Sequence, residues 1–125
     1  METHTSIARY NFKPMKYGTQ FSGWGIAISF DINGTETDVV SDIIGAKMNI
    51  RKCFNSKKIE KQLSLGSGLS INTQETPNIL VIDAGFTIDI DPAENVYDIA
   101  INFATYGKKN FIEGAFPVVN ASSVI

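Results

Sequence analysis

The alternation of apolar and polar residues over Trp24–Lys52 is the feature that most constrains the fold of this chain. Successive side chains of a β-strand point to opposite faces of a sheet, so a period of two indicates strands with one buried and one solvent-facing side. The pair Asn33-Gly34 separates two such runs, and both residues tolerate the positive φ angles of a tight turn. The stretch therefore predicts a β-hairpin followed by another half-buried strand around Met48.

The same period of two continues to the end of the chain. It predicts short strands near residues 63–65, 69–73, 79–82 and 86–90, and longer strands over Val96–Phe103 and Phe111–Val119. Pro117 cannot donate a hydrogen bond to a ladder, so the last strand is expected at a sheet edge or with a bulge there. Eight or nine short strands, with turn signals about every 8–12 residues and no convincing helix, predict an all-β sandwich or barrel.

The large apolar residues of these runs are the candidate core of the domain. We expect residues 24–52 and 96–119 to form the two halves of the sandwich, with their apolar faces packed against each other. The candidate core anchors are Trp24, Ile26, Ile28, Phe30, Met48, Ile50, Tyr97, Ile99, Ile101, Phe103 and Phe116.

The length of 125 residues predicts a single β-sandwich domain over residues 1–125, with an N-terminal arm at about residues 1–21. Cys53 is the only cysteine, so an intrachain disulfide is excluded. The net charge of −2 supplies no basic field for nucleic acid or an anionic membrane. The longest aliphatic run, Ile79–Ile82, is far shorter than the roughly 20 residues that span a bilayer.

Catalytic and metal-binding patterns are weak throughout the sequence. His4 is the only histidine, and one His with one Cys cannot make an ordinary zinc site within a single chain. Asp89 and Asp91 begin a calcium-loop pattern that lacks its third ligand and its glycine, which leaves open only a loose calcium site at the sandwich tip. We therefore predict no catalytic, cofactor-binding or metal-binding residues, no cofactor and no enzymatic activity.

Two segments carry side chains suited to contacts with a partner. Tyr10 and Phe12 could belong to a first strand or to an arm that packs on a neighbour. The loop over residues 17–25 interleaves aromatic residues with glycine, which indicates either a contact surface or rings that cap one end of the core. The segment Arg51–Gln62 keeps no helical period and is predicted to be an exposed basic loop that could meet an acidic partner surface. The candidate partner contacts are Tyr10, Phe12, Tyr17, Phe21, Phe54 and Ile59.

The order of these pieces resembles a family of small phage virion proteins. A Trp-led strand is followed by "GAKMNIRK", then by "LSLGSGLSI", and finally by the hairpin "VYDIAINFATYGKKNFIEGAFPV". The chain is similar over about residues 22–119 to the N-terminal domains of upper baseplate proteins of lactococcal-type phages. Their final hairpin pattern is matched by Tyr97-Asp98-Ile99, Gly107 and residues 114–118. One departure is the "DVVS" of residues 38–41, where the family usually has D-L-T-G.

The resemblance implies an immunoglobulin-like antiparallel β-sandwich of about eight to nine strands. It also implies a non-enzymatic virion structural protein, an adaptor or accessory subunit of the tail or baseplate that attaches fibres or neighbouring components. Its partners would be other virion proteins and copies of itself, with no nucleic acid, membrane or small-molecule substrate, after synthesis in the cytoplasm of a bacterial host. The alternatives are a carbohydrate- or receptor-binding β-sandwich module and a head decoration or head-fibre protein.

Overall fold

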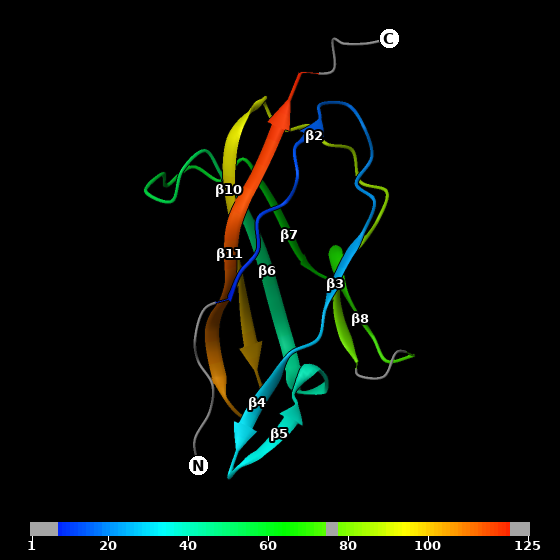
Figure 1. The fold of residues 1–125 in the computed structure, drawn as a ribbon, viewed down its shortest axis with the longest axis vertical. Helices are drawn as coiled ribbons and strands as arrows, with labels where there is room; N and C mark the ends of the chain where they lie inside the picture. The colour runs from blue at the N-terminus through cyan, green and yellow to red at the C-terminus, as the bar shows by residue number, and fades with distance from the viewer. Residues whose placement is uncertain (1–7, 75–77, 121–125) are drawn as a thin grey trace.

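The computed structural model describes residues 8–74 and 78–120, which form an all-β structure with one long curled sheet and a small second sheet (Figure 1). One short 3₁₀ turn, η1 (Val40–Asp42), lies between β5 and β6. The strands are β1 (Ala8–Arg9), β2 (Met15–Lys16), β3 (Trp24–Ile26), β4 (Ser29–Ile32), β5 (Thr35–Asp38), β6 (Ile43–Arg51), β7 (Lys61–Leu65), β8 (Gly68–Asn72), β9 (Ile79–Ile82), β10 (Ala93–Phe103) and β11 (Gly107–Val119).

The long sheet has the strand order β1-β11-β10-β6-β7-β8-β9-β3, and β2 also pairs with β11. Its middle is the antiparallel trio β6, β10 and β11, the longest strands of the chain. Because β6 and β10 pair side by side in this sheet, residues 24–52 and 96–119 are not two opposed halves of a sandwich, and that expectation is wrong. Three pairs are parallel, namely β1 with β11, β2 with β11 and β7 with β8. The sheet is therefore mixed, and the expectation of a purely antiparallel arrangement is wrong at these three pairs.

The β4–β5 hairpin forms the second sheet and projects at one end of the molecule (Figure 1). Asn33 and Gly34 occupy its turn with φ angles of 52° and 82°, which confirms the predicted hairpin. The preceding run does not continue through it as one strand, because β3 pairs with β9 in the long sheet and the chain then crosses to β4. This crossing places the start of the run at the end of a sheet, where Trp24 and Ile26 are only partly buried.

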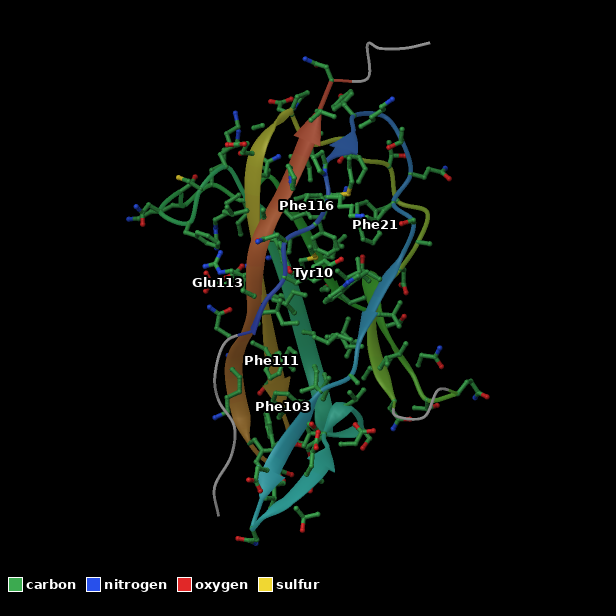
Figure 2. All side chains as sticks on the ribbon, in the orientation of Figure 1. Tyr10, Phe21, Phe103, Phe111, Glu113 and Phe116 are labelled. Atoms are coloured by element: carbon green, nitrogen blue, oxygen red, sulfur yellow. The ribbon has the colours of Figure 1, made fainter. Side chains whose placement is uncertain are left out.

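The other nine candidate core anchors are buried, as predicted. The aromatic rings of the domain form two groups along the molecule, and Figure 2 shows Phe21 and Phe116 in one half and Phe103 and Phe111 in the other. Phe30 lies 5.1 Å from Phe103 between ring centroids, so the small hairpin closes the second group.

Two β-bulges interrupt the central trio. Phe103 pairs with Ile43 while Asn102 pairs with Gly45, so Ile44 is the extra residue on β6. In the pairing of β10 with β11, Ile99 pairs with Ile112 and Ala100 with Asn110, so Phe111 is the extra residue on β11. A bulge leaves its extra residue outside the regular alternation, which explains why Ile44 is 63% exposed although it lies in a mainly buried strand.

The predicted strand at residues 86–90 does not form. Ile88 and Ile90 are buried as the alternation requires, but the only pairing there is an isolated bridge between Gln20 and Thr87. Backbone hydrogen bonds of residues 18–21 with residues 85–88 hold the two segments together instead. Alternation thus identified the buried side chains correctly without showing whether a neighbouring strand was within reach.

Candidate functional site

The N-terminal arm, residues 8–17, lies along the outer edge of β11 (Figure 1). The Tyr10 N–H donates to the Glu113 carbonyl at 3.1 Å, and the Phe12 N–H donates to the Ala115 carbonyl at 2.9 Å. The Ala115 N–H donates in return to the Asn11 side-chain oxygen at 3.0 Å. The arm therefore covers an edge that would otherwise expose a row of unpaired backbone groups.

Pro117 is compatible with a paired β11 because its backbone nitrogen faces the N-terminal arm and not β10. The carbonyls of Glu113, Ala115 and Val119 accept hydrogen bonds from the arm, so odd-numbered positions of this stretch direct their backbone polar groups toward it. Pro117 shares that side, opposite the gap in the arm's ladder between β1 and β2. The missing N–H thus costs the β10–β11 ladder nothing.

Two of the predicted partner contacts, Phe12 and Phe21, are buried in the core, which corrects their assignment to the surface. Phe12 is 9% exposed and Phe21 is 5% exposed. The Phe12 ring lies 5.3 Å from that of Phe116, 5.1 Å from that of Tyr97 and 5.4 Å from that of Trp24. The rings of the arm therefore cap one end of the core, while Tyr10 and Tyr17 remain exposed.

The β6–β7 loop, residues 52–60, is the predicted exposed basic loop. It extends from the sheet as the green loop in Figure 1. Its base is closed by the Glu60 N–H, which donates to the Ile50 carbonyl at 2.7 Å. Phe54 is 45% exposed and Ile59 is 39% exposed, so these two contact candidates do lie on the surface. A protruding loop that presents apolar side chains from the end of a rigid strand is well placed to bind a partner.

The charges of the β6–β7 loop are partly neutralised within the chain. Lys58 forms an exposed ion pair with Glu60 at 3.8 Å, and the neighbouring Lys61 forms one with Asp89 at 3.2 Å. Within the described residues, Lys52 and Lys57 form no ion pair. The loop therefore combines apolar side chains with free positive charge.

The outer face of the central strands carries a row of polar residues in register. Asn49, Asp98, Glu113 and Arg9 are successive cross-strand partners on β6, β10, β11 and β1. Arg9 pairs with Glu113 at 3.2 Å, whereas Arg51 lies 3.6 Å from Asp98, which is too long for a hydrogen bond. Burial raises the pKa of the Asp98 carboxyl, Arg51 lowers it and Glu113 raises it.

Of the two carboxylates that begin the calcium-loop pattern, Asp89 pairs with Lys61 at 3.2 Å. Residues 8–74 and 78–120 contain no group of three His, Cys, Asp or Glu side chains arranged to hold a metal ion. In that same part of the chain, no helix is long and apolar enough to cross a membrane. His4 lies outside the described residues.

No protein-family model, curated protein or solved structure matches this chain. The likeness to phage baseplate domains therefore rests on the order of sequence motifs, and it stays a prediction. The surfaces themselves are what the structure adds: the β6–β7 loop, the exposed tyrosines of the arm and the outer face of the central strands.

Proposed function

We propose that this protein is a non-enzymatic structural subunit of a bacteriophage virion, an adaptor or accessory protein of the tail or baseplate that holds neighbouring components. We further propose that its two sheets correspond to an immunoglobulin-like sandwich. The role requires a rigid body with a surface that binds other proteins, and it needs no catalytic centre. Assembly would follow synthesis in the cytoplasm of the bacterial host.

The observation that carries this proposal is the protruding β6–β7 loop with exposed Phe54 and Ile59. Apolar side chains at the centre of a protein interface usually provide most of the binding energy, and a polar rim surrounds them. Here Lys52 and Lys57 provide a basic rim, which favours a virion protein with an apolar, acid-rimmed surface as the partner. The loop begins at the end of β6, a central strand of the long sheet, and this position gives it a rigid base.

The test is mass spectrometry of purified particles, combined with variants of the loop. The wild-type chain is expected in the virion, and Phe54→Ser with Ile59→Ser is expected to reduce its incorporation strongly. Val119→Ser is the matched control, because Val119 is also exposed but lies on β11, which β10 separates from β6. Absence of the wild-type protein from purified particles would refute the virion role. Equal incorporation of the loop variant and the control would refute the role of the loop.

A carbohydrate-binding role has one observation in its favour. The exposed ring of Tyr10 lies 4.9 Å from that of partly buried Trp24, with 38° between the two ring planes, and the face of an aromatic ring can stack on a sugar ring. Titration with host-surface polysaccharides would then produce a saturable change in Trp24 fluorescence that Tyr10→Ala removes. An unchanged signal across these polysaccharides would eliminate this role.

A further inference from the structure

A groove of about 650 Å³ runs across the central strands, at the end of the sheet nearer the β4–β5 hairpin. Small residues of three neighbouring strands form its floor: Gly45, Ser64 and Ala100. The bulge at Ile44 opens it, because this bulge turns an exposed isoleucine toward one end of the groove. The groove is partly open to solvent, which suits a protein segment better than an enclosed small molecule.

Three lysines line the groove: Lys47, Lys108 and Lys109. Lys47 and Lys108 are exposed, and none of the three forms an ion pair with any described residue. The amide side chains of Asn102 and Asn110 lie among them. The groove thus offers uncompensated positive charge and hydrogen-bond donors around a floor of small residues, a combination that suits an acidic polypeptide.

The same chain contains a matching acidic element. Residues 17–46 carry four carboxylates and no Lys or Arg. Two of the four already accept hydrogen bonds from within the chain. Asp38 accepts hydrogen bonds from the Val40 and Asn78 N–H groups, and Asp42 accepts hydrogen bonds from Thr105. The other two, Asp31 and Glu36, are on the projecting hairpin.

Asp31 and Glu36 are direct cross-strand partners in the β4–β5 hairpin. Like charges in this position destabilise a strand pair. Glu36 accepts one hydrogen bond, from the Ser29 hydroxyl at 2.7 Å, and one carboxylate oxygen of Asp31 is buried without a hydrogen-bond partner among the described residues. A lysine from outside the chain that pairs with the exposed Glu36 carboxylate would offset this repulsion.

We propose that the lysine-lined groove binds the acidic β4–β5 hairpin of a second copy of this chain. The hairpin is a separate two-stranded sheet that projects from the body, so its tip can reach a neighbouring molecule (Figure 1). The groove carries only positive charge and the hairpin only negative charge, so the pairing is complementary on both sides. The contact joins two different surfaces, so it either closes reciprocally into a dimer or repeats head to tail. It does not depend on the virion role, and absence from particles would leave it standing.

Sedimentation velocity of the full chain tests this contact. Wild type is expected to associate at up to ~1 mM protein in ~20 mM salt and to dissociate in ~500 mM salt, because salt screens exposed charges. Lys108→Glu and Glu36→Lys should each weaken association about tenfold or more, and an equimolar mixture of the two should restore it. Lys13→Glu is the matched control, since Lys13 is exposed on the arm and belongs to neither surface. Thermal unfolding of each variant verifies that it remains folded.

Three results would overturn the proposal. The first is a wild-type chain that stays monomeric at low salt over this whole concentration range. The second is a mixture of the two reversed-charge variants that associates no better than either alone. The third is a loss of association in Lys13→Glu as large as that in Lys108→Glu, which would indicate a nonspecific effect of net charge.

Discussion

Replacement of Gly114 by alanine should detach the N-terminal arm from β11. A Cβ at this buried position would overlap the carbonyl oxygen of Tyr10, because the arm backbone crosses directly over the glycine. The Tyr97 hydroxyl donates to that same carbonyl at 2.8 Å, so the oxygen is held in place from another side. The overlap is with backbone atoms, and a change of side-chain rotamer cannot relieve it.

The expected cost follows from what the arm loses. Removal of the Phe12 ring from the core corresponds to about 3–5 kcal/mol, as for a buried Phe-to-Ala change. Each lost hydrogen bond adds about 1 kcal/mol, and those of the Tyr10 N–H, the Phe12 N–H and the Tyr97 hydroxyl are all affected. Complete detachment would thus cost roughly 6–8 kcal/mol. Since the arm can shift in part, we expect Gly114→Ala to lower the free energy of unfolding by at least about 3 kcal/mol.

Urea denaturation and limited trypsin digestion would measure this effect. Arg9 and Lys16 lie in the arm and neither is followed by proline, so detachment should expose new trypsin cleavage sites there. Gly45→Ala is the matched control, because its Cβ would meet only Asn102 at an ordinary contact distance of 3.7 Å. We expect the control to change stability by no more than about 1 kcal/mol. Equal stability and equal protease resistance of the two variants would refute the placement of the arm.

Four further substitutions test the core and the buried polar groups. Tyr97→Phe should cost about 1–1.5 kcal/mol through loss of the hydrogen bond to the Tyr10 carbonyl. Burial also raises the pKa of Tyr97, so the unfolded chain ionises first and wild-type stability should fall as the pH rises above about 10, a fall that Tyr97→Phe should reduce. Burial likewise raises the pKa of Asp98 above 3.8, so this carboxyl stabilises the fold below that pH and loses its contribution as the pH rises through the raised pKa. Asp98→Asn should therefore raise the urea midpoint at neutral pH but not below about pH 4, and a constant difference across this range would contradict the assignment. Trp24→Ala should lower the free energy of unfolding by about 2–3 kcal/mol, and Phe116→Ala by roughly 4–5 kcal/mol, because Trp24 is only partly buried. Equal losses for the two variants in calorimetry would contradict this ranking.

Much of the fold follows from local pattern. The alternation over Val96–Phe103 and Phe111–Val119 locates β10 and β11, because one face of each strand is buried against the core. The exposed β6–β7 loop was also predicted, since its charged residues keep no apolar period. The run at residues 86–90 shows the limit of this reasoning. Its apolar residues Ile88 and Ile90 alternate and are buried, but the segment forms only one isolated bridge and no regular strand pairing.

The sequence by itself determined the class of the fold, the hairpin at Asn33-Gly34 and most of the core, because these depend on side-chain period and turn chemistry within a few residues. Only the tertiary structure decided where the arm lies. Phe12 was predicted to contact a partner because it lies in the N-terminal arm, yet it packs against rings about a hundred residues away in the chain. The lysine-lined groove is likewise a product of pairing, since Lys47 and Lys108 lie on one face only through the registers of β6, β10 and β11. Alternation determines which face of a strand is buried, but the choice of neighbouring strand depends on long-range packing that no short sequence window contains.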